Sequence, residues 1–197
     1  MEGMRTPKIE MKTLERIRRQ RILSEIEGYL ELLMLFDDAL AARIENRHRI
    51  AQRALDSFER LSEKTRAGAI AQHLRGQALR SLDRYAEAVV PLRAAADLEP
   101  ENLHIWLALG WCYKRCDRLD MAIESLQEAI TAKPGTAIVH YNLACYWSLA
   151  HNLEAALNNL SIAFELDPDY KELVHKEHDF DPIRNDPGFR QLTAMLV

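Results

Sequence analysis

Apolar residues recur along this chain at spacings of three and four, the period of an α-helix that buries one face. In residues 103–136, Trp106 and Leu109 share a face of one predicted helix, and Ile123 and Leu126 share a face of the next. The alternating pattern of a β-strand does not occur there. With only seven glycines and seven prolines in 197 residues, the pattern predicts an all-α chain.

The same pattern returns every 34 residues without a gap. Segments that begin at Ala69, Leu103 and Ala137 have glycine or alanine at position 8, alanine at position 20, leucine at position 24 and proline at position 32. Small residues at positions 8 and 20 allow the two helices of a unit to approach closely, while large residues fill the surrounding space. The proline falls beyond the second helix, where it ends the helix without breaking an internal hydrogen bond. We therefore expect stacked antiparallel helix pairs, each burying its apolar face against a neighbour.

The middle segment carries Trp106-x2-Leu109-Gly110-x2-Tyr113, followed by Ala122-x3-Leu126, Ala129 and Pro134. This pattern resembles the tetratricopeptide repeat, and the resemblance extends over residues 69–170. It implies an α-α superhelix, or solenoid, whose first helices line a groove for a partner. The closing segment around Pro182 and Pro187 resembles those of many bacterial tetratricopeptide proteins, so we expect a bacterial source.

The repeat frame predicts six parts. They are an N-terminal basic and amphipathic helical extension (1–34), a degenerate repeat (35–68), three repeats (69–102, 103–136 and 137–170) and a C-terminal capping segment (171–197). The extension carries a stripe of Ile22, Ile26, Leu30 and Leu33. This stripe could cap the solenoid, pair with a second chain in a homodimer, or lie in the groove, and we place capping first.

Pro91 departs from the repeat pattern because it falls at position 23, inside the predicted second helix of the first clear repeat. A proline there removes one backbone hydrogen bond. We expect a kink near residues 87–91 without loss of the helix. Asp83 and Asp117, at position 15, fall in the predicted turns between helices, where their side chains can cap.

Charge is distributed unevenly. Residues 1–21 hold seven basic and three acidic side chains, although the whole chain has a net charge of −4. Such a cluster is typical of contact with nucleic acid or an acidic partner, but it also fits a solvated helix face, because the basic residues alternate with Leu14, Ile17 and Ile22. The lack of aromatic residues beside the cluster favours the solvated face.

The remaining chemistry argues against an enzyme. The sequence has no glycine-rich phosphate loop, nucleophile elbow or metalloprotease spacing. Four polar residues near the C-terminus could be mistaken for a metal cluster, but we expect them to be surface groups; they are His175, His178, Asp179 and Asp181. We expect no metal and no cofactor.

The hydropathy and the N-terminal pattern indicate a cytoplasmic protein, and the cysteines indicate no disulfide framework. Three cysteines, Cys112, Cys116 and Cys145, give no disulfide framework and are expected to be buried or half-buried thiols. No apolar run approaches the roughly 20 residues that span a bilayer, and Met1 is not followed by a signal-peptide pattern.

The predicted function is a non-enzymatic protein–protein interaction module, a scaffold or adaptor that binds a protein or peptide in its groove. By the resemblance, the groove wall consists of His73, Gln77, Arg80, His104, Leu107, Trp111, Lys114, Ile138, Tyr141, Asn142 and Cys145. Trp111 lies off the packing stripe, so it is either an anchor for a partner or covered by the N-terminal helix or an adjacent unit. Asn142 stands where related proteins often hydrogen-bond a peptide backbone.

The peptide we expect there has apolar anchors and some acidic residues. Two alternatives remain open. One is a nucleic-acid-associated helical repeat that uses the basic N-terminal segment, and the other is a structural subunit or homodimer.

Overall fold

The computed structural model describes residues 7–34 and 41–194, and within these ranges the chain is helical, without a β-strand. The chain forms two compact units, residues 1–98 and 99–197. The prediction of an all-α helical repeat is confirmed. Along the same two ranges, no helix combines the length and the hydropathy that crossing a bilayer requires.

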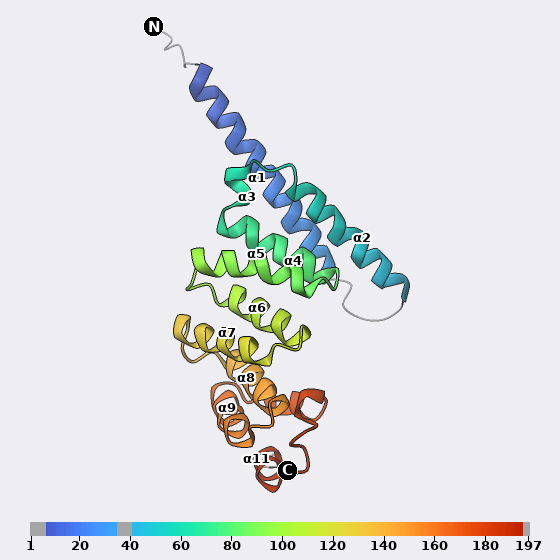
Figure 1. The fold of residues 1–197 in the computed structure, drawn as a ribbon, viewed down its shortest axis with the longest axis vertical. Helices are drawn as coiled ribbons and strands as arrows, with labels where there is room; N and C mark the ends of the chain where they lie inside the picture. The colour runs from blue at the N-terminus through green and yellow to red at the C-terminus, as the bar shows by residue number, and fades with distance from the viewer. Residues whose placement is uncertain (1–6, 35–40, 195–197) are drawn as a thin grey trace. The chain divides into compact units, whose positions relative to one another are not determined.

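Unit 1 contains two long helices followed by a short helix and a helix pair (Figure 1). Its elements are α1 (Pro7–Met34), α2 (Ala41–Phe58), α3 (Glu63–Arg66), α4 (Ala69–Ser81) and α5 (Tyr85–Leu98). The second half of α1 lies against α2 and α4, because its apolar stripe is buried there. The buried stripe is Ile22, Ile26, Leu30 and Leu33, and it shares a core with Ala51, Ala54, Phe58 and Leu74.

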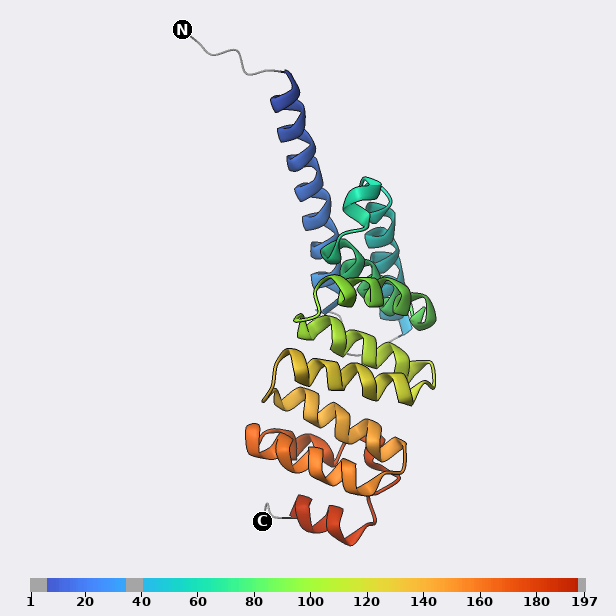
Figure 2. The same cartoon turned by 60° about the vertical axis from the view of Figure 1, so that its left-hand side comes forward.

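The first half of α1 continues beyond the helices that cover its second half (Figure 2). Every side chain from Met11 to Arg21 is exposed. The stripe that we expected to cap, to dimerise or to lie in the groove is thus buried within its own unit, while the basic half of the same helix faces solvent.

The degenerate repeat expected over residues 35–68 differs from the structure. Such a unit would turn at position 15, which is Arg49, but α2 runs unbroken from Ala41 to Phe58. The stretch has neither glycine nor proline, and Ala51, Ala54 and Phe58 form one buried face directly after the expected turn. The helix therefore pairs with α1 as a single long element. Residues 35–40 of that predicted unit lie outside the described ranges.

Unit 2 continues with two more helix pairs and a closing segment. Its elements are α6 (Leu103–Arg115), α7 (Leu119–Ala132), α8 (Ala137–Leu149), α9 (Leu153–Leu166), α10 (Tyr170–Val174), the 3₁₀ helix η1 (His178–Phe180) and α11 (Pro187–Ala194). Neighbouring helices from α6 to α9 pack in sequence order. Leu109, Leu126, Leu143 and Leu160 form the centre of this packing and are at most 2% exposed.

Glycine at position 8 allows the two helices of a repeat to approach closely. A methyl group on Gly76 would lie 2.6 Å from Leu92 Cδ2, and one on Gly110 would lie 3.3 Å from both Leu126 Cδ2 and the Ala122 carbonyl oxygen. Each leucine occupies position 24 of the repeat that contains its glycine, and both are fully buried. The repeated small residue is therefore a steric requirement of the helix crossing.

The first helix of each repeat ends just before position 15, where the residue adopts a left-handed backbone conformation. The φ angles are 59° at Asp83, 57° at Asp117 and 57° at His151. In each turn the next amide donates back to the carbonyl five residues earlier, as from Arg84 to Leu79 at 3.0 Å, which is the closure of a Schellman motif. Asp83 and Asp117 thus terminate the first helix through their backbone.

Position 4 anchors the first helix to the connection that precedes it. Trp106 Nε1 donates to the Pro100 carbonyl at 2.7 Å, and Gln72 Nε2 donates to the Arg66 carbonyl at 2.6 Å. Two chemically different residues thus form the same link to the backbone six residues earlier. At this position in the third repeat, His140 instead pairs with Asn159 at 3.1 Å.

Pro91 is tolerated inside α5, which is helical throughout Tyr85–Leu98. The ring is buried beside Leu92 in the helix pair. The helix is retained as predicted, with its stability supplied by packing in place of the missing hydrogen bond.

Candidate partner-binding face

The predicted groove residues of unit 2 lie on α6 and α8. We call them the α6–α8 face, which consists of His104, Leu107, Trp111 and Lys114 of α6 with Ile138, Tyr141, Asn142 and Cys145 of α8. The Lys114 ammonium lies 5.7 Å from the centroid of the Tyr146 ring, so the end of α6 contacts α8. The structure therefore brings the two predicted rows of side chains onto adjacent helices.

The α6 part of this face is open. Trp111 is 37% exposed, and the guanidinium of Arg115, one turn further along the helix, lies 5.8 Å from its ring centroid. His104 is exposed and Leu107 is half-buried. A large aromatic side chain beside an aliphatic one is the composition typical of an anchor for a protein partner.

The α8 part is mostly covered by the protein's own C-terminal segment. The fully buried ring of Phe180 lies 5.7 Å from the ring of Tyr141 in an edge-on arrangement, and the ring of Tyr170 lies 4.9 Å from that of Tyr141. As a result Tyr141 is 6% exposed and Cys145 only 2%. We expected both on a solvent-facing wall, and they are instead in the core because η1 packs on α8.

An ion pair fastens the covering segment to α6. Lys114 Nζ donates to the Asp179 carboxylate, and both side chains are more than three-quarters buried. Lys114, expected to face a ligand, is thus engaged within its own unit. Asp179 is held in place in turn, since its amide donates to Glu177 Oε1 at 3.2 Å.

Arg184 organises the turn that presents Phe180 and Asp179. Its guanidinium donates to the Glu177 carbonyl at 2.6 Å and to Asp181 Oδ1 at 2.9 Å. The hydrogen bond from Arg184 holds the pKa of the Asp181 carboxyl below its ordinary value. The covering segment is therefore a built element with its own internal hydrogen bonds.

Burial keeps the polar groups under this segment uncharged. It raises the pKa of the Tyr141 hydroxyl and of the Cys145 thiol well above their ordinary values, with the carboxylates of Asp179 and Glu177 acting in the same direction. The Tyr141 hydroxyl finds no hydrogen-bond partner among the residues that the structure describes. A protonated, buried thiol is a packing group and a poor nucleophile.

What remains open on the α6–α8 face is a smaller patch. It comprises His104, Leu107 and Trp111 of α6 with Ile138, which is 40% exposed, and the half-buried Asn142 of α8. We call this the Trp111 patch. It combines three apolar side chains with an amide that can both donate and accept a hydrogen bond.

The other predicted groove residues, His73, Gln77 and Arg80, lie on α4 in unit 1. All three are half-buried, and Gln77 Nε2 lies 3.0 Å from His73 Nε2, one helical turn away. Among the described residues of α4, Ile70 is the one large apolar side chain that is exposed, at 54%. The stronger candidate is therefore the patch in unit 2.

The C-terminal residues considered as metal ligands have other roles. Asp179 pairs with Lys114, and His178 Nδ1 lies 3.3 Å from Asp181 Oδ2 on the surface. Within the described part of the chain, no three His, Cys, Asp or Glu side chains converge as a metal site would require. No disulfide joins the three cysteines, all of which lie on or beside α6 and α8.

Comparison with known proteins agrees with the fold. The family model of the tetratricopeptide repeat matches residues 79–144. The crystal structure of YrrB, described as a tetratricopeptide repeat protein with an unusual peptide-binding site, superposes with a TM-score of 0.60 at 21% identity, covering 79% of this chain and 87% of its own. MamA from Desulfovibrio magneticus RS-1 gives a TM-score of 0.56 at 22% identity, covering 80% of this chain and 95% of its own.

The "Phagocyte signaling-impaired protein" of Drosophila pseudoobscura pseudoobscura is 32% identical over 84 residues, which is 43% of this chain. The chain spans only 9% of that protein's length. Residues 79–144 thus match the tetratricopeptide repeat family, and the helix pairs of the chain have the fold of YrrB, a tetratricopeptide repeat protein.

Proposed function

We propose that the chain is a non-enzymatic scaffold that binds a protein or peptide segment on the Trp111 patch. The observation that carries this proposal is the exposure of Trp111 on α6, next to Leu107, at the part of the face that the C-terminal segment leaves open. An aromatic side chain that is one-third exposed retains apolar area that a partner can bury. The peptide-binding site named for YrrB, a protein of the same fold, supports this reading.

The patch selects for an apolar anchor with limited polar contact. Leu107 and Ile138 offer aliphatic surface, and Asn142 offers one amide for the backbone of a bound segment. Lys114 is held by Asp179, so it contributes no cation for a ligand carboxylate. The ligand we expect is therefore a peptide with one or two large apolar side chains, which the patch recognises mainly by their shape.

Binding of selected peptides tests the proposal. Peptides selected from a random displayed library against the full chain would be titrated with the wild type, with Trp111→Ala and with Val90→Ala. Val90 is a matched control because it is 70% exposed but lies on α5, outside the patch. We expect Trp111→Ala to weaken binding by about thirtyfold, the effect of a 2 kcal/mol anchor, and Val90→Ala to change it by less than about twofold. Equal affinity in Trp111→Ala would remove the patch from consideration.

A further inference from the structure

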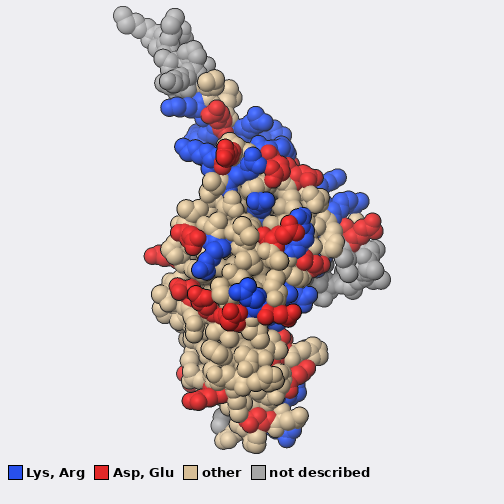
Figure 3. Space-filling model, viewed as in Figure 1, with Lys and Arg blue, Asp and Glu red and all other residues tan. Residues whose placement is uncertain are grey.

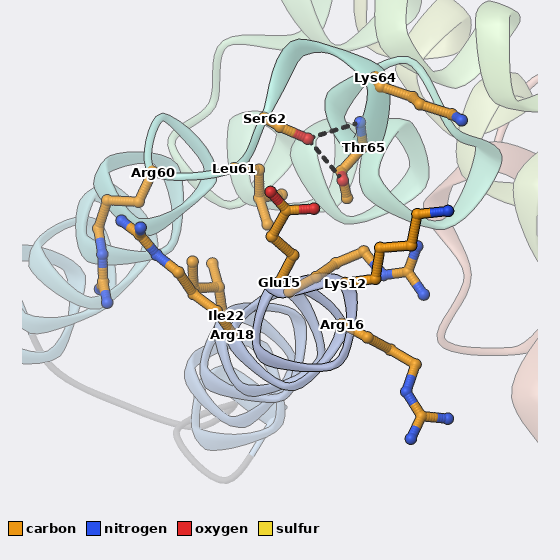
Figure 4. Close-up of a pocket in the computed structure, with 11 residues that line it drawn as sticks. Lys12, Glu15, Arg16, Arg18, Ile22, Arg60, Leu61, Ser62, Lys64 and Thr65 are labelled. Carbon is orange, nitrogen blue, oxygen red and sulfur yellow. Dashed lines mark hydrogen bonds between the residues drawn. The ribbon is translucent and has the colours of Figure 1, made fainter. Parts of the chain in front are cut away.

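The exposed half of α1 forms one wall of a pocket of about 740 Å³ in unit 1 (Figure 4). The opposite wall is the connection from α2 to α4, which includes α3. Lys12, Arg16, Arg18 and Arg19 line the first wall, and Arg60 and Lys64 line the second. We call this the α1–α3 pocket. Basic side chains from segments that lie more than forty residues apart in the sequence thus line one hollow.

The charge in this pocket is largely uncompensated. Glu15 is the one acidic side chain among its described lining residues. Arg60 donates to Glu25 at 2.8 Å, but no ion pair within the described ranges holds the other five cations. Residues 1–98 carry 18 basic and 15 acidic side chains, and six of these basic side chains line this one pocket. Figure 3 shows Lys and Arg gathered along this half of α1. Such a concave cluster raises the local concentration of anionic partners.

The pocket also has an apolar floor. Ile22 and Leu61 line it between the two rows of cations and are otherwise buried in the core. On α1 the basic residues alternate with Met11, Leu14 and Ile17, each more than half exposed. A ligand that matches this arrangement has negative charges together with apolar side chains.

This combination favours a protein segment over other polyanions. No aromatic ring lines the described pocket, so a base of single-stranded nucleic acid would find no stacking surface there. A bilayer surface is flat, whereas these cations lie on the two walls of a hollow. We propose that the α1–α3 pocket binds an acidic segment of a partner protein, with Asp and Glu side chains against the two walls and an apolar side chain toward Ile22 and Leu61.

This site is separate from the Trp111 patch. It lies in unit 1 and shares no residue with the α6–α8 face. The chain would thus offer two different recognition surfaces, one apolar and one basic, as a scaffold that joins two partners requires. The two proposals fail independently, because Trp111→Ala leaves the pocket intact.

Direct binding with a matched pair of variants tests the pocket. The probe is a fluorescein-labelled peptide of alternating Glu and Leu residues, and its Gln–Leu counterpart serves as the uncharged control. Arg16→Gln with Lys64→Gln removes one cation from each wall. Arg53→Gln with Lys176→Gln removes the same charge from exposed sites outside the pocket. Circular dichroism verifies that each variant retains the helical content of the wild type.

We expect the acidic peptide to bind the wild type and to weaken about tenfold in the pocket variant, but to change less than about twofold in the control variant. Binding should also weaken when salt is raised from about 0.05 M to about 0.5 M, because exposed charges are screened. Equal losses in the two variants, or no preference for the acidic peptide over its Gln counterpart, would overturn the proposal.

Three further probes separate the competing occupants. Single-stranded DNA of equal charge, or vesicles containing phosphatidylserine, would overturn the proposal if they bound more tightly than the peptide and depended on Arg16 and Lys64. Sedimentation of the protein alone tests a second copy. A dimer that dissociates only in the pocket variant would assign the pocket to self-association and overturn it as well.

Discussion

The ring of Phe180 lies edge-on to the ring of Tyr141 with their centroids 5.7 Å apart, although the two residues are 39 positions apart in the sequence. Through this contact the protein's own closing segment occupies a surface that the repeat pattern assigns to a ligand. The consequence is that the candidate site is confined to the Trp111 patch. The contact also makes Phe180 the residue on which the closing segment depends.

Phe180→Ala should destabilise unit 2 by about 3 to 5 kcal/mol, since it removes a fully buried aromatic ring and leaves a cavity against Tyr141 and Phe189. Urea unfolding of the full chain, followed by circular dichroism, measures the effect. Leu173→Ala is the control, because Leu173 is 51% exposed in the same segment and should cost less than about 1 kcal/mol. Similar losses in both variants would mean that Phe180 does not anchor the segment.

Thiol labelling should distinguish the three cysteines. Burial and the neighbouring carboxylates raise the pKa of Cys145, so its reactive thiolate stays scarce at neutral pH and its alkylation by iodoacetamide should be slow. Cys116, which is half-buried at the end of α6, should react first. Mass spectrometry of timed samples gives the order.

Opening the closing segment should change only one of these rates. In Phe180→Ala, Cys145 should react much faster, while Cys112, fully buried between helices, should stay slow. If Cys145 of the wild type reacted as fast as Cys116, the closing segment would not cover α8 as described.

His151→Gly should stabilise the protein by about 1 kcal/mol. His151 adopts a φ of 57° at position 15, where glycine has no Cβ penalty and is the residue that Schellman turns prefer. Its side chain is exposed, so its removal costs little. Thermal unfolding measures the gain, and His151→Val should lower the midpoint because a β-branched residue is strained there. A loss of stability with glycine would contradict the turn geometry.

The two repeat glycines should differ in their tolerance of a methyl group. Gly76→Ala places a Cβ 2.6 Å from Leu92 Cδ2 and should cost about 1 to 3 kcal/mol by overpacking. Gly110→Ala meets its nearest atoms at 3.3 Å, and the gain in helix propensity of about 1 kcal/mol offsets most of that strain. Urea midpoints of the two variants give the comparison. A larger loss of stability for Gly110→Ala than for Gly76→Ala would mean that the two helices cross more closely at Gly110 than at Gly76.

The sequence predicts the repeats well because their packing is local. Position 8 faces positions 20 and 24 of the same unit, so the contact of Gly110 with Leu126 depends only on the 34-residue frame. Three helix pairs accordingly start at Ala69, Leu103 and Ala137. Between Ala41 and Phe58 the chain has no glycine or proline, and Arg49 stands at the turn position, so this stretch forms one continuous helix.

The site is less predictable because it depends on contacts between distant segments. Tyr141 and Cys145 occupy positions that face outward from the repeat, and nothing in the repeat itself indicates that Phe180 and Tyr170 cover them. The apolar residues of the closing segment predict a lid, but not the surface on which it lies. In the same way, the sequence predicts a solvated helix face for the basic cluster of α1, and only the structure places Arg60 and Lys64 in the same pocket.

Photo-cross-linking of a selected peptide to the full chain tests the central claim most directly. The peptide carries a photoreactive group beside its apolar anchor, and mass spectrometry identifies the residues to which it attaches. Binding at the Trp111 patch predicts cross-links to α6 around Leu107 and Trp111 and to α8 around Ile138. Cross-links confined to α7, α9 or unit 1, with none on α6, would contradict it.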